Sequence, residues 1–132
     1  MTDIPTNLAN IYKRVDLALE SSGRSVKDII LVAASKGHSS DAIRVAYECG
    51  QRHFGENYLQ EAQKKQYELT DLLDICWHFI GPIQSNKTSK ISNNFDWVHT
   101  VDRIKIAERL SGSRDANKPL LNICIQVNVS EE

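Results

Sequence analysis

Short apolar or aromatic stretches recur along the chain at intervals of 21 to 24 residues. They begin at Ile29, His53, Cys76, Trp97 and Leu121. Polar segments with helix-type spacing lie between them, and an interval of this size fits a strand, a loop, a helix and a second loop. The repeat therefore predicts five β units within a single α/β domain that covers residues 1–132.

The helices are predicted from apolar residues that recur three or four positions apart. An amphipathic opening helix is expected over residues 7–19, before the stop signal Ser21–Gly23. Residues 39–41 offer an N-cap to a second helix that ends at Gly50. Two further helices are expected at Tyr58–Leu69 and Arg103–Leu110, and a short, weak one within the polar segment Gln84–Asn94.

Two of the predicted strands bear on the architecture. Ile29–Ala34 is apolar without alternation, which suits a strand buried on both faces of a parallel sheet, and Leu121–Val129 is expected to be the last strand. A five-stranded doubly wound sheet of flavodoxin type would be complete at this length. A (β/α)₈ barrel needs about 200 residues or more, so the chain would supply only part of one. The pattern alone favours the doubly wound sheet.

Composition narrows the function classes. Lys and Arg number 16 against 17 Asp and Glu, and this balance argues against a nucleic-acid-binding protein. The longest apolar stretch, Ile29–Ala34, is far shorter than the roughly 20 residues of a membrane helix. The three cysteines lack a C-x-x-C pair and fit neither a disulfide framework nor a zinc site. With no secretory signal at the start, a soluble cytoplasmic protein is expected.

Lys36 is the first candidate for chemistry, because it follows the run Ile29–Ala34 at the carboxyl end of a predicted strand. Parallel α/β folds place their active sites at such ends. Partial burial lowers the pKa of a lysine amine, and an uncharged amine attacks an aldehyde to form a Schiff base. The alternative is a surface lysine that points from a loop into water, and position alone favours that alternative.

Asn57 and His78 belong to two further strand-end clusters. Asn57 is placed either to bind a ligand oxygen or to cap the helix expected from Tyr58. Glu56, directly before it, is expected to be solvated or ion-paired. His78 lies within an aromatic strand, where a histidine more often lines a core or a barrel than acts on a substrate. No second ligand at a suitable spacing supports a metal site there, so none is predicted.

Three segments taken together resemble one protein family closely. These segments are Leu31–Lys36, Phe54–Glu61 and Trp77–Lys87. In this order and at these separations they are similar to motifs of the pyridoxal phosphate homeostasis protein family (YggS/PROSC). The similarity extends over residues 7–19, His99–Arg103 and Gln126–Ser130, so it spans essentially all of the chain.

The resemblance implies an alanine-racemase-like (β/α)₈ TIM barrel, of which this chain carries about five of the eight strands. It implies that Lys36 holds pyridoxal 5′-phosphate as a Schiff base and that Asn57 and His78 line the cofactor pocket. Family members resemble non-catalytic carriers that keep the free cofactor low, which implies a role in intracellular pyridoxal phosphate homeostasis. The implied partner is the small-molecule cofactor, without nucleic acid or membrane. A racemase-like enzyme acting on an amino acid is the alternative, and it would need a second acid–base group opposite Lys36.

The length adds one expectation to this resemblance. In such barrels the phosphate is held by loops after the last strands and by a helix N-terminus. A five-stranded part also leaves open strand edges and an apolar inner face. We therefore expect the 132-residue chain by itself to bind the cofactor weakly, if at all, and a non-binding truncated fragment is the third alternative.

Overall fold

The computed structural model describes residues 3–130, in which helices and strands alternate along the chain. The α-helices are α1 (Ile4–Ser22), α2 (Ser40–Glu48), α3 (Leu59–Glu68), α4 (Thr88–Asn94) and α5 (Ile104–Ser113). The strands are β1 (Ala33–Ala34), β2 (His53–Glu56), β3 (Cys76–Phe79), β4 (Trp97–Val101) and β5 (Asn122–Ile125). Short 3₁₀ helices, η1 and η2, lie at Val26–Asp28 and Ser85–Lys87.

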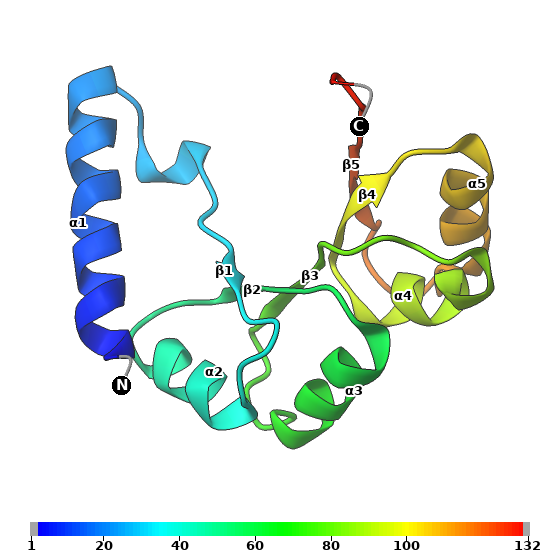
Figure 1. Ribbon diagram of the computed structural model, residues 1–132, viewed down its shortest axis with the longest axis horizontal. Coiled ribbons are helices and arrows are strands. Elements are labelled where there is room, and N and C mark those ends of the chain that lie inside the picture. The colour runs from blue at the N-terminus through cyan, green and yellow to red at the C-terminus, as the bar shows by residue number, and fades with distance from the viewer. Residues whose placement is uncertain (1–2, 131–132) are drawn as a thin grey trace.

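The five strands form one parallel sheet in the order β1-β2-β3-β4-β5. Each strand therefore pairs with the strand of the next unit, as in a (β/α)₈ barrel, whereas a doubly wound sheet reverses its order at a switch point. The strands line the inside of an arc and α2 to α5 lie on its outside (Figure 1). This arrangement confirms a partial, barrel-type α/β fold, and the doubly wound sheet favoured by the pattern alone is wrong.

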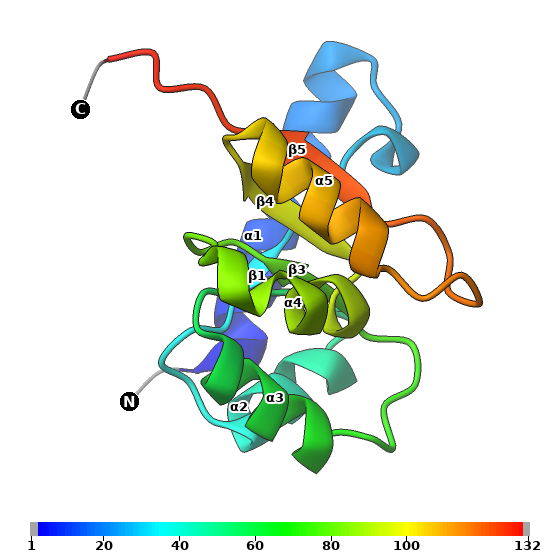
Figure 2. The same ribbon diagram turned by 90° about the vertical axis from the view of Figure 1, so that its right-hand side faces the viewer.

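The core lies between the sheet and the outer helices, in two apolar clusters. One joins β3 and β4 to α3, α4 and α5, which follow one another across the sheet (Figure 2). Its centre includes Val98 and Ile106, both fully buried, and an edge-to-face contact between Phe79 and Phe95. The other cluster joins β2 to α1 and α2 around Phe54. The side chains that face outward from the strands therefore build the core, and the alternate side chains are left on the inner face.

β1 is shorter and less buried than the sequence predicts. Of the apolar run Ile29–Ala34, only Ala33–Ala34 pairs with β2, and Ile30 is 48% exposed. β1 is an edge strand with a single neighbour in the sheet, β2. The expectation of burial on both faces is therefore wrong for this strand.

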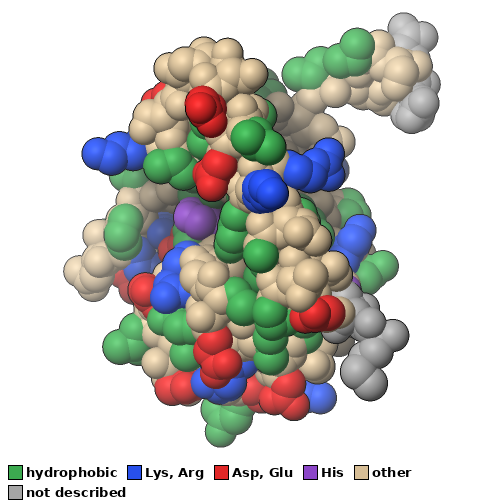
Figure 3. All heavy atoms as spheres, turned by 90° about the vertical axis from the view of Figure 1, so that its left-hand side faces the viewer, with side chains coloured by type: hydrophobic (Ala, Val, Ile, Leu, Met, Phe, Trp, Pro, Cys, Tyr) green, Lys and Arg blue, Asp and Glu red, His purple; other side chains and the backbone are tan. Residues whose placement is uncertain are grey.

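β5 forms the other edge of the sheet and is also shorter than the predicted strand, Leu121–Val129. Ile125, Val127 and Val129 are 76%, 71% and 89% exposed. Seen from the α1 side, hydrophobic side chains remain visible among the charged ones, and a histidine lies at the bottom of a hollow (Figure 3). The expected open edge with exposed apolar side chains is thus present.

The helix starts follow local capping chemistry. Ser39 accepts a hydrogen bond from the Ala42 N–H at 3.2 Å and so caps α2, as predicted. α1 begins earlier than predicted, at Ile4, because the Asp3 carboxylate accepts from the Thr6 N–H. Among residues 3–130, no helix is both long and apolar enough to cross a membrane.

Candidate functional site

The carboxyl ends of β1, β2 and β3 bring two of the three candidate residues to one edge of the sheet. The parallel register pairs Ala34 with Gly55, and Gly55 with His78. Lys36 and Asn57 each follow two positions after their paired residue, Ala34 or Gly55, so both leave the sheet at the same edge. His78 lies two residues lower, at the level of Gly55.

Lys36 occupies the turn between β1 and α2 and is exposed. Partial burial, which the sequence interpretation considered for this lysine, is therefore not provided by the described residues. Within residues 3–130 its amine has no hydrogen-bond or ion-pair partner. Gly37, the next residue, has a φ of 77°, which favours glycine over a residue with a side chain. The lysine amine is thus free to meet a ligand from solvent.

The backbone on both sides of Lys36 is held by hydrogen bonds from charged groups. The Lys65 ammonium donates to the carbonyl oxygen of Ser35 at 3.0 Å. The N–H of Gly37 donates to the Glu61 carboxylate, also at 3.0 Å. Both partners come from α3, so this helix fixes the Cα of Lys36 while leaving its side chain free.

These contacts depend on a buried ion pair between Glu56, the last residue of β2, and Lys65. The Lys65 Nζ lies 2.9 and 3.1 Å from the two carboxylate oxygens of Glu56 and 2.8 Å from Oε1 of Glu61. Glu56 is 0% exposed and Lys65 is 5% exposed, and the Ser35 hydroxyl also donates to the Glu56 carboxylate. Hydrogen bonds from Lys65 and then from the Gly37 N–H lower the pKa of Glu61. Glu56 was expected to be either solvated or ion-paired, and the structure shows that it is ion-paired.

Lys65 was missed by the sequence interpretation. It shares the buried face of α3 with Leu59 and Ala62, which precede it by six and three positions. A lysine inside an apolar helical stripe needs a partner, because an unpaired buried charge is very costly. Glu61, four residues earlier on the helix, marks the same place. A lysine in an apolar helical stripe, with a glutamate four residues before it, was therefore the sequence signal that could have identified this ion pair.

Asn57 does not cap α3. Its side-chain oxygen Oδ1 is buried and, within the part of the chain that the structure describes, has no hydrogen-bond partner. Gly81 packs against the backbone of Asn57, since a Cβ on Gly81 would lie 2.4 Å from the Asn57 carbonyl oxygen. A mainly apolar crevice of about 160 Å³ beside Asn57 is lined by residues that include Phe79, Gln84 and Lys87. The capping alternative is therefore wrong, and the amide oxygen is left buried with no hydrogen bond among the described residues.

His78 is 1% exposed and joins two further histidines on the inner face of the sheet. Its Nε2 lies 2.9 Å from Nδ1 of His53, and its Nδ1 lies 2.8 Å from Nε2 of His99. The indole of Trp97 stacks on its ring. Burial first, and then the neighbouring histidines, lower the pKa of His78 to about 4. His78 is thus a neutral, lining imidazole, and it lies below the edge that carries Lys36 and Asn57.

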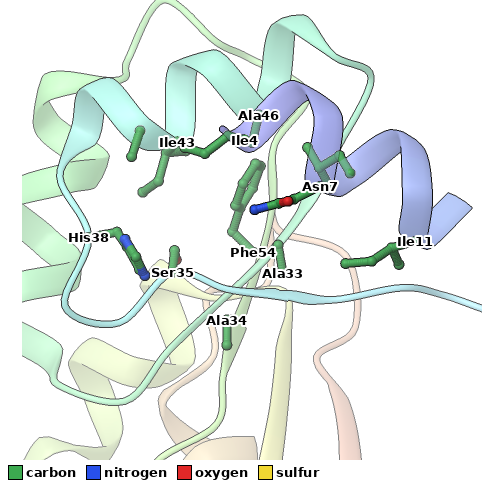
Figure 4. Close-up of a pocket in the computed structure, with 12 residues that line it drawn as sticks. Ile4, Asn7, Ile11, Ala33, Ala34, Ser35, His38, Ile43, Ala46 and Phe54 are labelled. Carbon is green, nitrogen blue, oxygen red and sulfur yellow. The ribbon is translucent and has the colours of Figure 1, made fainter. Parts of the chain in front are cut away.

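A separate apolar pocket of about 190 Å³ lies on the outer side of β1, between α1 and α2. Figure 4 shows Phe54, Ile43 and Ile11 directed into it, with Ser35 and His38 toward the turn after β1. Neither Lys36 nor Asn57 lines this pocket. It therefore belongs to the packing between the first helices and the sheet rather than to the edge that carries the candidate residues.

Comparison with known sequences finds close relatives over the whole chain. The pyridoxal phosphate homeostasis protein of Pseudomonas aeruginosa is 53% identical over 132 residues, which cover all of this chain and 57% of the relative. The protein of the same name from Escherichia coli is 45% identical over 134 residues, again 57% of the relative. No family model matches the chain. The chain thus spans little more than half the length of the curated relatives it matches.

Solved structures agree with this result. PipY of Synechococcus elongatus, solved with pyridoxal phosphate (PLP) bound, superposes with a TM-score of 0.69 at 45% identity, over 84% of this chain and 48% of that one. A protein of Bifidobacterium adolescentis, described only as unknown, superposes with a TM-score of 0.72 at 30% identity, over 83% of this chain and 48% of its own. In each comparison the similar region covers about half of the longer chain.

Proposed function

Because the chain belongs to the pyridoxal phosphate homeostasis protein family, we propose that it binds pyridoxal 5′-phosphate through Lys36 and serves intracellular pyridoxal phosphate homeostasis without catalysing a reaction of its own. The chain covers 57% of its curated relatives, and the proposal extends to the longer protein of which those relatives are examples. It assigns the amine to Lys36 and lining roles to Asn57 and His78.

The observation that carries the proposal is the pairing of a free amine with an orphaned amide at one sheet edge. Lys36 is exposed, and the Oδ1 of Asn57 is buried without a partner. An unpaired buried carbonyl oxygen costs about 1–3 kcal/mol, so a ligand that donates a hydrogen bond to it recovers that cost. Pyridoxal phosphate offers an aldehyde to an amine and a hydroxyl to an acceptor. The two residues therefore fit the cofactor.

The cofactor supplies an aldehyde, which condenses with a primary amine and releases one water molecule. The residues of this chain place that amine. Lys65 fixes the carbonyl before Lys36 and Glu61 fixes the N–H after it, so the lysine Cα is held before any ligand arrives. Such preorganisation reduces the ordering cost of binding. His78 contributes a buried, neutral lining surface rather than a charge.

Absorption spectroscopy with chemical trapping tests this proposal. The chain is mixed with pyridoxal phosphate, reduced with borohydride and mapped by peptide mass spectrometry. We expect the phosphopyridoxyl group on Lys36 in the wild type and its loss in Lys36→Ala. Lys64→Ala, which removes an exposed lysine of α3, is the matched control and keeps the label on Lys36.

Labelling spread evenly over surface lysines would overturn the assignment of Lys36. The same trapping is then made on the P. aeruginosa relative, substituted at the position that aligns with Lys36. A label in the relative but not in the 132-residue chain supports the expectation of weak binding by the chain alone. A label at that position in neither protein contradicts the proposed function.

The location and partners complete the proposal. We propose a cytoplasmic protein whose partner is the small-molecule cofactor, without nucleic acid or membrane. Cys49, Cys76 and Cys124 are all unpaired thiols, which suits a reducing compartment. Balanced numbers of acidic and basic residues, 17 and 16, suit a protein without a phosphate-backbone partner. Fractionation of cells with an antibody against the chain tests the location.

A further inference from the structure

A second cluster of reactive side chains lies on the inner face of the sheet, below the edge that carries Lys36. His53 is the first residue of β2, and the register places it opposite Cys76, the first residue of β3. Cys76 and His78 are alternate residues of β3, so their side chains point to the same face. One donor atom from each of these three residues lies within 4.8 Å of the other two. We call His53, Cys76 and His78 the inner-face cluster.

We propose that the inner-face cluster is a binding site for a transition-metal ion of borderline softness, and that Zn²⁺ is the ion it fits best. The ligands are Nδ1 of His53, Sγ of Cys76 and Nε2 of His78. Two imidazole nitrogens and one thiolate, with a fourth position left for water or another ligand, form a donor set typical of zinc. This proposal requires neither pyridoxal phosphate nor Lys36, but it shares His78 with the lining of the proposed cofactor pocket.

Of two donor-atom distances in the cluster, the sulfur–nitrogen distance agrees with tetrahedral zinc and the nitrogen–nitrogen distance is shorter. Bonds of about 2.0–2.1 Å to nitrogen and about 2.3 Å to sulfur imply about 3.3 Å between two nitrogens and about 3.6 Å between nitrogen and sulfur. The Cys76 Sγ lies 3.7 Å from the His78 Nε2. The His53 Nδ1 lies 2.9 Å from the same nitrogen, close to the distance that a shared proton sets. A small rotation of the His53 ring replaces that proton with the ion.

The surroundings of His78 already orient it as a ligand. Its Nδ1 lies 2.8 Å from Nε2 of His99, and its ring stacks on Trp97 with centroids 5.6 Å apart. When the Nδ1–H donates to His99, the lone pair of Nε2 points to the cluster. Metal-bound histidines usually have such an outer partner. The Asp96 carboxylate accepts from the Trp77 N–H at 2.8 Å. Burial first, and then the Asp96 charge, raise the pKa of the Cys76 thiol to about 11, so a bound ion must displace the thiol proton.

An ion can also reach the inner-face cluster. His53 and Cys76 are only half-buried, whereas His78 is enclosed behind them. The sequence interpretation predicted no metal because it looked for ligands close together along the chain. His53 and Cys76 are instead 23 positions apart and meet only through strand pairing.

Metal titration of the tag-free chain tests the proposal. Zn²⁺ binding is followed by calorimetry, and Co²⁺ is used as a spectroscopic probe because a thiolate ligand gives a sulfur-to-cobalt absorption band. We expect one Zn²⁺ per chain and a sulfur-to-cobalt band in the wild type. Cys76→Ser removes the band, and both Cys76→Ser and His53→Gln weaken Zn²⁺ binding by about 10-fold or more.

Matched variants separate this site from other thiols and imidazoles. Cys49→Ser removes another half-buried thiol and His38→Gln removes an exposed imidazole, and both are expected to bind Zn²⁺ as the wild type does. Circular dichroism of each metal-free variant establishes whether it is folded. If Cys76→Ser does not fold, His53→Gln, at the start of β2, provides the test instead. A wild-type chain that binds no Zn²⁺, or a folded Cys76→Ser or His53→Gln that binds it as tightly as the wild type, overturns the proposal.

Discussion

The ammonium of Lys65 lies 2.9 Å from Oε1 of Glu56, and the two side chains are only 6% and 1% exposed. This ion pair connects α3 to the end of β2, and the same ammonium binds the carbonyl of Ser35 beside Lys36. A buried pair pays a large desolvation cost, so it stabilises the fold only while both charges are present. The pair therefore couples the stability of the sheet edge to the placement of Lys36.

Removing one charge of this pair is expected to be costly. Lys65→Met leaves the Glu56 carboxylate buried with the Ser35 hydroxyl as its remaining donor, and we expect the free energy of unfolding to fall by about 3–5 kcal/mol. Urea denaturation measures this loss. The double variant Glu56→Leu with Lys65→Met should recover most of it, because no charge is then left buried.

The control for this prediction is Lys64→Met, the exposed neighbour on the same helix, which should change stability by less than about 0.5 kcal/mol. If Lys65→Met cost less than about 1 kcal/mol, the pair would behave like an exposed salt bridge and its structural role would be refuted.

Gly81 is expected to tolerate no side chain. A Cβ at this position would lie 2.4 Å from the carbonyl oxygen and 2.8 Å from the Cα of Asn57, and backbone cannot move aside cheaply. We expect Gly81→Ala to lower the free energy of unfolding by about 1–3 kcal/mol. Gly112→Ala is the matched control, because nothing lies within 4 Å of its Cβ and alanine should stabilise α5 by about 0.5–1 kcal/mol. Equal effects of the two substitutions on urea denaturation would contradict this account.

The sequence predicted the alternation of helices and strands well but not the edges of the sheet. The run Ile29–Ala34 has the composition of a central strand, yet only Ala33–Ala34 joins the ladder, because hydropathy does not say which strand lacks a neighbour. Side-chain contacts between separate elements could not be predicted from the sequence either. Lys65 and Glu56 are nine positions apart on a helix and a strand, and their contact follows only from how α3 packs on the sheet.

The same difference holds for the candidate site residues, because the positions of Lys36 and Asn57 were predicted but the contacts of the site were not. Lys36 and Asn57 were placed correctly at strand ends, because parallel units put all such ends on one edge. The unpaired oxygen of Asn57 could not be foreseen, since a cap at Tyr58 was equally compatible with the spacing. The contacts of His78 with His53 and His99 depend on the register of three strands.

Asn57 is expected to favour binding of pyridoxal phosphate while adding nothing to the free energy of unfolding, or lowering it. Its buried Oδ1 has no partner among residues 3–130, so Asn57→Ala should leave the free energy of unfolding unchanged or raise it by up to about 1 kcal/mol. If the proposed function holds, the same substitution lowers the yield of trapped phosphopyridoxyl group on Lys36. The two readouts are urea denaturation without ligand and peptide mapping with it. A variant that is less stable but labels normally would show that Asn57 is structural only.

Glu61 links the turn that carries Lys36 to pH. Hydrogen bonds from Lys65 and from the Gly37 N–H hold the pKa of this carboxyl below its ordinary value of 4.5. A group whose pKa is lowered in the folded state stabilises the fold above the unfolded-state pKa, and that contribution is lost as the pH falls through the folded-state pKa. Glu61→Gln cannot titrate, so its deficit in unfolding free energy relative to the wild type should be full near neutral pH and shrink below 4.5.

Urea denaturation of both proteins from about pH 7 to about pH 3 measures this difference. Glu68→Gln, an exposed carboxylate at the end of the same helix, is the control for general charge effects. Protonation of Glu61 also turns the charged acceptor of the Gly37 N–H into a weaker, neutral one, so the turn should loosen over the same pH range. Hydrogen exchange at Gly37 follows this directly, after correction for intrinsic rates. A deficit for Glu61→Gln that stays constant over the whole range would show that the carboxylate charge does not hold the turn.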